Sequence, residues 1–171
     1  MTNIFRYLTC LMVVFLSLVL SHADGYSRSR WSHTQPEINL THVFMGEINR
    51  KGKPVGYHSR PGGKDPDNAR VVKILARSNC HGVYTARVAL FDSAAGAWKE
   101  KFSSFFPDNL AKKEVVEAIL HAWKNKEKGR QRPWQGPSGL GFTIQGYLNK
   151  RGNITTAFPL YRKESPGQCT P

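Results

Sequence analysis

Two histidines in the first half of the chain, His42 and His58, are the residues whose type and spacing first suggest chemistry. The polar, glycine-bearing residues 50–53 between them favour a chain reversal, which would bring the two imidazoles to one site. Two histidines can share the work of general base and general acid near neutral pH, because their ordinary pKa lies close to it. The simpler alternative is that each histidine is a hydrogen-bonded, half-buried structural residue.

The first 23 residues are typical of a secretory signal peptide. Arg6 supplies a positive charge, residues 8–20 are almost wholly apolar, and the SHA sequence at residues 21–23 offers a cleavage site between small residues. The apolar run is short for a membrane span, although an uncleaved anchor is the alternative. We therefore expect a secreted or periplasmic protein with no stable membrane insertion after the signal is removed.

The charge of the chain indicates a polyanionic partner. All 171 residues together carry a net charge of +13, and loss of the signal removes only Arg6, which leaves +12. A secreted protein this basic is expected to meet nucleic acid, an anionic membrane surface or a polyanionic glycan. Charge alone does not separate these classes, and the length predicts one domain.

Three cysteines are present, and Cys10 leaves with the signal. We predict that Cys80 and Cys169 form a disulfide in an oxidising compartment and tie the C-terminal tail to the middle of the domain. No cysteine or histidine cluster has the spacing of a structural zinc site.

Hydrophobic patterning predicts an α+β fold with antiparallel sheet rather than a βαβ repeat. After the signal we expect a flexible leader at residues 24–37, one domain at 38–162 and a tail at 163–171. Strands are predicted at residues 69–75 and 82–91, an extended segment at 98–106, and a hairpin at 142–148 and 154–161. One helix is predicted between the extended segment and the hairpin, capped by Asp108 or Asn109. Its apolar face is made of Val115, Val116, Ile119, Leu120 and Trp123.

Two further stretches complete a constellation with the histidines: WKEKFSSFFP at residues 98–107 and ITTAFP at residues 154–159. Two histidines and a lysine are what metal-free RNA cleavage by transesterification needs. One imidazole removes the proton from the ribose 2′-hydroxyl, the other protonates the departing 5′-oxygen, and the lysine stabilises charge in the transition state. The attacking group belongs to the RNA, so no protein nucleophile is required.

Four motifs in this order resemble those of the EndoU family, in particular the bacterial EndoU-type toxin nucleases. They are H-V-F-x-G-E at residues 42–47, G-Y-H-S at 56–59, K-x-S-S-F-F-P at 101–107 and I-T-T-A-F-P at 154–159. Each motif is weak alone, but their order and spacing are specific. The resemblance implies an endoribonuclease that leaves a 2′,3′-cyclic phosphate on single-stranded RNA, usually at a pyrimidine and often at uridine. It also implies antiparallel sheets with helices packed around a cleft.

Carried over position by position, the resemblance assigns catalysis to His42, His58 and Lys101. Lys99 stays the alternative to Lys101, because residues two apart on a strand share a face. Thr156 matches the family's serine or threonine that contacts the substrate. Phe158 stands where an aromatic residue, often tyrosine, stacks on the base.

Two more residues, Ser103 and Tyr161, are expected to bind substrate, the latter only if the strand end curls toward the cleft. Phe158 keeps the aromatic face but lacks the tyrosine hydroxyl, which removes a contact that a uridine preference could use. The expected partners are RNA and, if the chain is a bacterial toxin, an immunity or inhibitor protein. We expect a monomer that requires no cofactor; some relatives are stimulated by Mn²⁺, although no carboxylate cluster here would hold the ion.

Two other functions compete with this hypothesis. A secreted polyanion-binding protein without catalysis would use a phosphate-binding patch of Arg50, Lys51, Lys53, Arg130 and Arg132. A membrane-active cationic protein would need an amphipathic helix with a cationic polar face, whereas the predicted helix is mixed in charge.

Overall fold

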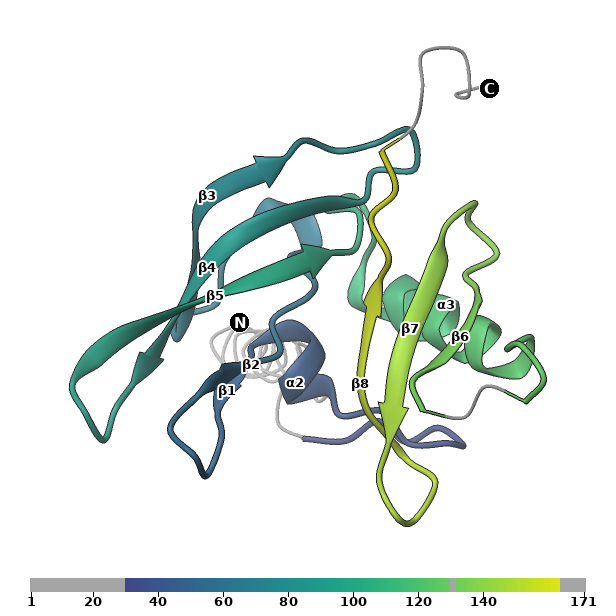
Figure 1. Ribbon diagram of the computed structural model, residues 1–171, viewed down its shortest axis with the longest axis horizontal. Helices are drawn as coiled ribbons and strands as arrows, with labels where there is room; N and C mark the ends of the chain where they lie inside the picture. Colours follow the sequence, from purple (N-terminus) through teal and green to yellow (C-terminus); the bar gives the residue numbers. More distant parts are fainter. Residues whose placement is uncertain (1–29, 130–131, 164–171) are drawn as a thin grey trace, which may run out of the picture.

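Antiparallel β-strands make up most of the regular secondary structure of the computed structural model, which describes residues 30–129 and 132–163 (Figure 1). The strands form three sheets, in the orders β1-β2, β3-β4-β5 and β6-β7-β8. Within the described residues, two α-helices and one 3₁₀ turn accompany them. In chain order the elements are α2 (Leu40–Phe44), β1 (Glu47–Ile48), β2 (Pro54–Val55), η2 (Pro61–Gly63), β3 (Ala69–Ala76), β4 (Tyr84–Asp92), β5 (Ala97–Phe105), α3 (Lys112–Lys124), β6 (Trp134–Pro137), β7 (Thr143–Leu148) and β8 (Ile154–Pro159).

The predicted chain reversal between the two histidines is confirmed as the β1–β2 hairpin. The Asn49 side chain accepts hydrogen bonds from the backbone N–H groups of Lys51 and Lys53 at 2.9 and 3.0 Å. An asparagine side chain that satisfies the turn backbone in this way is a strong local turn former. The reversal places the segment after β2 beside α2.

Strand β4 buries the face that the alternation predicts, although Thr85 and Ala89 on its other face are buried as well. In β4, Tyr84, Ala86, Val88 and Leu90 are buried on one face, as the period of two requires. This face packs on Tyr57 and Phe105 and forms one of two buried apolar clusters. β5 is the outer strand of its sheet and carries the predicted lysines.

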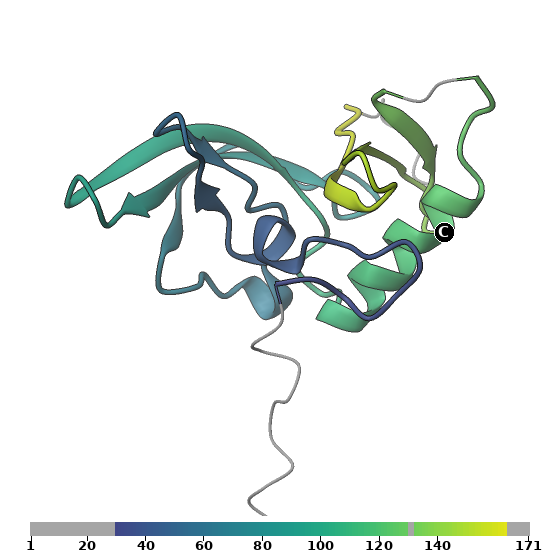
Figure 2. The same ribbon diagram turned by 90° about the horizontal axis from the view of Figure 1, so that it is seen from below.

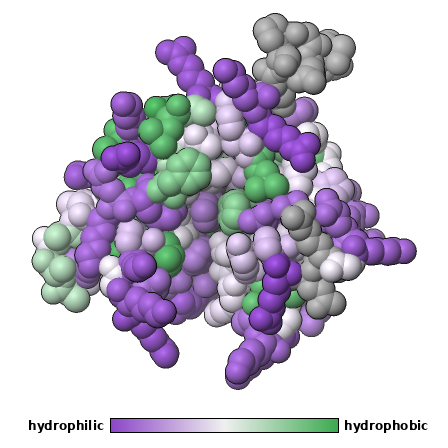
Figure 3. Space-filling view, viewed as in Figure 1, coloured by the Kyte–Doolittle hydropathy of each residue, from purple (hydrophilic) through white to green (hydrophobic). Residues whose placement is uncertain are grey.

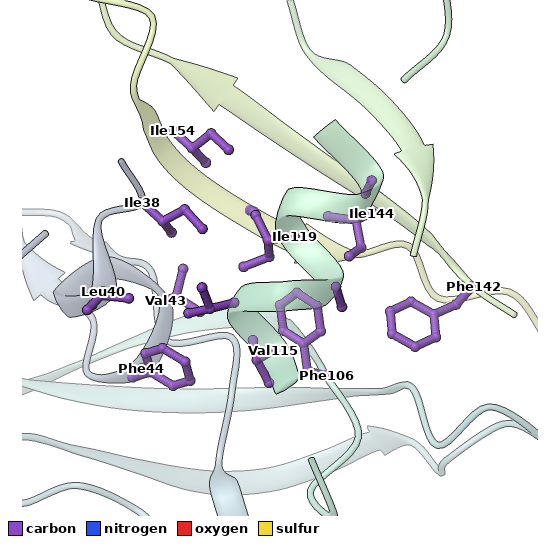
Figure 4. Close-up of a cluster of buried hydrophobic side chains, with 14 of the residues drawn as sticks. Ile38, Leu40, Val43, Phe44, Phe106, Val115, Ile119, Phe142, Ile144 and Ile154 are labelled. Carbon is purple, nitrogen blue, oxygen red and sulfur yellow. The ribbon is translucent and has the colours of Figure 1, made fainter. Parts of the chain in front are cut away.

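The second apolar cluster lies where α2, α3 and the β6–β8 sheet meet. Figure 4 shows Val43 of α2, Ile119 of α3 and Ile154 of β8 pointing toward one another. Figure 2 shows α2 between the β3–β5 sheet on one side and α3 with the β6–β8 sheet on the other. The short helix that carries His42 is therefore held between the two halves of one domain.

Helix α3 has the predicted apolar face, but its predicted cap is wrong. Neither Asp108 nor Asn109 caps the helix; Ala111 is the N-cap residue, and its N–H donates to the Glu114 carboxylate at 2.7 Å. The Asp108 carboxylate instead accepts a hydrogen bond from the Tyr84 hydroxyl at 2.7 Å. The tertiary hydrogen bond to Tyr84 therefore occupies the Asp108 side chain, which the local sequence predicted to cap α3.

Strand β6 was not predicted, because Pro133, Gly136 and Pro137 suppress the local strand pattern. An outer strand tolerates proline, because one side of its backbone has no ladder partner in its sheet. Gly136 is required for close packing, since a Cβ atom there would lie 2.0 Å from the Ala122 carbonyl oxygen of α3. Gly136 weakens the strand pattern in the sequence, and the same residue allows β6 to pack closely on α3.

Part of the predicted flexible leader is packed against the domain. Trp31 forms an isolated β-bridge with Asn39, and Ser32 is only 1% exposed. The Ser32 N–H donates to the Ile38 carbonyl at 2.9 Å, so this backbone has fixed partners. Residues 1–29, Arg130 and Cys169 lie outside the described residues, so the signal peptide and the Cys80–Cys169 disulfide stay predictions.

We predict that Ile119→Ala lowers the free energy of unfolding by about 2–5 kcal/mol, because it leaves a cavity in the cluster that holds α2. Lys113→Ala on the exposed side of the same helix is the matched control and should change it by less than about 0.5 kcal/mol. Urea unfolding followed by far-UV circular dichroism measures both values. Equal effects at the two positions would contradict the proposed packing of α3.

Candidate active site

His42 is held by a short helix that is anchored on both sides. The Asn39 side chain caps α2 by accepting a hydrogen bond from the His42 N–H at 3.1 Å. Val43 and Phe44 bury the opposite side of the helix in the core. The His42 Nδ1 atom lies 3.3 Å from a Glu47 carboxylate oxygen, and Arg30 binds the other carboxylate oxygen at 2.8 Å.

His58 reaches the same place through backbone contacts to α2. The Tyr57 N–H donates to the His42 carbonyl, and the His58 N–H donates to the Val43 carbonyl, both at 2.7 Å. The approach is so close that a Cβ atom on Gly56 would lie 2.2 Å from the His42 carbonyl oxygen. Gly56 has φ +76°, where glycine is favoured, and Tyr57 itself adopts φ +62°. The two imidazole rings end with their centroids 6.1 Å apart.

The ring of His58 is held from behind by two serines. Its Nδ1 atom lies 3.1 Å from the Ser104 carbonyl oxygen and 3.0 Å from the Ser103 hydroxyl. A carbonyl oxygen can only accept, so Nδ1 carries the proton and, in the neutral ring, Nε2 keeps its lone pair. The Ser103 hydroxyl donates to the Tyr57 carbonyl at 2.5 Å, which leaves its oxygen free to accept from Nδ1.

Burial and like charges lower the pKa of both histidines. For His42, burial is the main cause, and the hydrogen bond and charge of Glu47 act against it. The His58 pKa is lowered well below its ordinary value, first by burial and then by the charges of Lys101 and His42. His42 has a carboxylate partner that favours its protonated form, whereas the two groups at His58 Nδ1 are uncharged.

The contacts of the two candidate lysines separate them. Lys101 donates to the Gly56 carbonyl at 2.8 Å, next to the histidine segment, and burial lowers its pKa to about 8. Lys99 instead pairs with Asp92 at 2.6 Å and donates to the Gly52 carbonyl at 2.9 Å. Lys99 therefore ties the β1–β2 turn to the sheet, and Lys101 supplies the positive charge beside both imidazoles.

Strand β8 brings two of the expected substrate-binding residues. The Phe158 ring lies with its centroid 5.1 Å from that of His58. The Thr156 hydroxyl oxygen is buried and has no hydrogen-bond partner among the described residues. The other two are not placed to face a substrate. Ser103 is only 1% exposed and contacts the His58 ring at Nδ1, and Tyr161 packs against the core cluster of α2 and α3.

Two contributors to the site were not singled out from the sequence. Glu47 lies in the H-V-F-x-G-E motif, and its position five residues after His42 was the available signal. Ser104 acts through its backbone carbonyl, which no side-chain pattern reveals.

Residues 30–129 and 132–163 contain no group of three or more histidine, cysteine, aspartate or glutamate side chains placed to hold a metal ion. Within the same residues, no helix is both long and apolar enough to cross a membrane.

Comparisons with known proteins match this chain to one family. The family model described as bacterial EndoU nuclease matches residues 36–161. A Bacillus cereus protein named "Toxin" is 30% identical over 124 residues, which cover 70% of this chain and 22% of that relative. This chain therefore matches about a fifth of the length of that relative. No solved structure matches it.

We predict that Lys101→Met raises the pKa of both His42 and His58, because it removes a positive charge that disfavours the imidazolium forms. Lys99→Met is the matched control and should leave both values in place, because its ammonium is paired with Asp92. NMR titration of the histidine ring protons measures the two pKa values. Equal shifts in the two variants would show that Lys99 shares the site.

Proposed function

The chain belongs to the bacterial EndoU nuclease family, and from this premise we propose that it is an endoribonuclease that cleaves single-stranded RNA by transesterification. The observation that carries the proposal is the meeting of His42, His58 and Lys101, with the two imidazole centroids 6.1 Å apart. The RNA supplies its own nucleophile, the ribose 2′-hydroxyl. The products are a 2′,3′-cyclic phosphate and a free 5′-hydroxyl.

His58 is the general base in this proposal. Its hydrogen-bonded Nδ1 leaves the Nε2 lone pair to accept the proton of the 2′-hydroxyl. Its lowered pKa keeps the ring neutral at the pH of the reaction. As the proton leaves, the 2′-oxygen forms a bond to phosphorus.

His42 is the general acid. Its contact with Glu47 stabilises the imidazolium form, so a proton is available for the departing oxygen. The bond between phosphorus and the 5′-oxygen breaks, and His42 transfers its proton to that oxygen. The proton gained by His58 and the proton lost by His42 balance over the step.

Lys101 stabilises the charge that develops on the phosphoryl oxygens. Its pKa of about 8 keeps the ammonium protonated in neutral and acidic solution. Partial burial strengthens its interaction with the transition state relative to a fully solvated lysine. This reaction uses only side chains and substrate, and we propose that it needs no metal cofactor, with Mn²⁺ at most stimulatory.

Substrate binding is assigned to β8. Phe158, beside His58, stacks on a base, and the unpartnered Thr156 hydroxyl contacts the same nucleotide. We propose cleavage at pyrimidine sites, often uridine, in a cleft between the two halves of the domain. The phenyl ring offers stacking without the hydroxyl that a tyrosine would add.

The family and the name of the relative support a proposal for the biological setting. A nuclease related to a protein named "Toxin" is proposed to act as a secreted or periplasmic monomeric toxin or effector. Its producer must keep it away from its own RNA, so an immunity or inhibitor protein is the proposed partner. The charge of +13 favours RNA binding through phosphate contacts.

Purified mature chain is predicted to cleave an oligonucleotide that contains one ribonucleotide in a deoxyribose strand, and to leave a 2′,3′-cyclic phosphate there. An all-deoxyribose strand should resist, because it lacks the nucleophile. Folded His42→Ala and His58→Ala should each lose nearly all cleavage, and the double variant should be scarcely worse, because the two act as a unit. Gel analysis with and without chelator, followed by end-group analysis, measures these outcomes.

Cleavage of the all-deoxyribose strand at an undiminished rate would rule out transesterification. Binding of RNA without any cleavage would favour the non-catalytic polyanion-binding function instead.

The pH dependence of kcat/KM is predicted to be bell-shaped with its optimum below pH 6.5. His58 must be neutral and sets the acidic limb, whereas His42 must be protonated and sets the alkaline limb. Both pKa values are lowered from 6.5, so both limbs lie on the acidic side. Glu47→Gln removes two contributions that raise the His42 pKa and should move the alkaline limb to lower pH. Initial cleavage rates at low substrate concentration across a range of pH give the kcat/KM profiles of the native chain and of Glu47→Gln. An unmoved alkaline limb in the variant would contradict the assignment of His42 as the acid.

A further inference from the structure

A row of three side chains crosses the β6–β8 sheet and ends at the candidate active site. The ladder places Gln135 opposite Gln145, and Gln145 opposite Phe158. Residues directly opposite each other in an antiparallel pair share a face of the sheet, with Cβ atoms about 4.5–5.5 Å apart. The centroid of the Phe158 ring lies 5.1 Å from that of His58. Gln145 is therefore the next residue in the row after the ring on which the proposed function stacks a base.

The row lies on the face of this sheet that is turned away from α3. Ile144 and Ala157, which alternate with the row, are buried in the cluster to which α3 belongs. Gln135, Gln145 and Phe158 are half-buried. Figure 1 shows α3 behind β7, so the face that carries the row is turned toward the viewer, and Figure 3 shows polar and apolar side chains mixed over this region. A mixed surface suits recognition of a base better than docking of an apolar protein surface.

The amide of Gln145 is oriented by its neighbour in the row. The Gln135 Nε2 atom donates a hydrogen bond to the Gln145 Oε1 atom at 2.6 Å. This bond fixes which end of the Gln145 amide is directed toward β6. Among the described residues, the Gln145 Nε2 atom has no hydrogen-bond partner, so its N–H groups are the ones available to a ligand.

An amide that offers N–H groups selects a base that presents an oxygen. Uracil, like thymine, carries a carbonyl oxygen at its 4-position, where cytosine carries an amino group that donates. A donor that faces the uracil oxygen forms a hydrogen bond, whereas two donors that face each other both lose their partners. The orientation of the Gln145 amide therefore favours uracil over cytosine.

We propose that Gln145 is a specificity-determining residue, whose Nε2 donates to the 4-carbonyl of a uracil stacked on Phe158, and that Gln135 is the positioning residue that orients its amide. The inference rests on the proposed RNA cleavage and assigns its base preference to one side chain. Phe158 offers stacking and Thr156 a hydroxyl that can donate or accept, so neither of them distinguishes uracil from cytosine by itself. The alternative is that the two glutamines form only a cross-strand pair between β6 and β7.

Gln145→Glu is the sharpest test, because a carboxylate still accepts from Gln135 but has no N–H to donate. The measurement is the ratio of kcat/KM for uridine to that for cytidine, in oligonucleotides with one ribonucleotide at the cleavage position and deoxyribose elsewhere. The native chain should favour uridine about tenfold. Gln145→Glu should favour cytidine, because its carboxylate accepts from the amino group of cytosine. A ratio within one variant cancels any loss of rate that the new charge causes for both substrates.

Three further variants complete the comparison. Gln145→Leu removes the donor and should bring the ratio close to one, and Gln135→Leu should lower the ratio without reversing it. Asn109→Asp is the matched control, because it makes the same change from amide to carboxylate in an exposed turn before α3, and it should keep the native ratio. An unchanged ratio in both Gln145 variants would overturn the proposal and leave the glutamines as a cross-strand pair.

Binding of uncleavable strands separates this proposal from the proposed function. The probes are all-deoxyribose strands that are abasic except for one deoxyuridine or one deoxycytidine, and fluorescence anisotropy gives the Kd of each. The native chain should bind the deoxyuridine strand more tightly, and Gln145→Glu should reverse this order. If the native chain shows this preference but never cleaves RNA, the assignment of Gln145 stands and the ribonuclease proposal fails. If it cleaves RNA with the same ratio in the native chain and both Gln145 variants, the ribonuclease proposal stands and the assignment of Gln145 fails.

Discussion

The site depends on the pair of backbone hydrogen bonds that join the segment after β2 to helix α2. The Tyr57 and His58 N–H groups donate to the carbonyls of His42 and Val43, both at 2.7 Å. These bonds set the spacing of the imidazoles more firmly than side-chain contacts could, because the backbone has fewer freely rotating bonds. They require Gly56, where a larger residue would strike the His42 carbonyl.

The left-handed conformation of Tyr57 is supported by contacts on the far side of the histidines. Its hydroxyl donates to Asp65, which also pairs with Arg60 at 2.6 Å, and its ring meets Phe105 edge-on at 5.1 Å. Non-glycine residues persist in this conformation when their surroundings hold them there. The loop between β2 and β3 therefore serves the site although it contributes no reacting group.

Electrostatics distinguish two residues of the same type. His42, His58 and Lys101 are titratable groups gathered in a partly buried place, where burial lowers the pKa of all three and the charge of Lys101 further lowers the pKa of both histidines. Glu47 offsets this at His42, whereas His58 meets a carbonyl and a hydroxyl. A negatively charged phosphate is the natural complement of such a site. The asymmetry on which the proposed base and acid roles rest comes from these neighbours and not from the histidines themselves.

The local pattern of the chain was enough for much of the fold and for the candidate residues. The alternation in β4, the turn at residues 50–53 and the apolar face of α3 depend on neighbouring residues, and the family motifs are short runs of sequence. Strand β6 escaped prediction because proline and glycine mask it, and the cap of α3 escaped because Tyr84 binds Asp108 from another strand.

The sequence by itself determined the family and the pair of histidines, because motif identity and order are local properties. Only the tertiary structure favours Lys101 over Lys99 as the proposed catalytic lysine, since alternation puts both on one face and Lys99 is paired with Asp92. The proposed roles of His42 and His58 also rest on the tertiary structure. Those roles depend on a carboxylate from β1 and a carbonyl from β5, which meet the two rings only after the chain has folded.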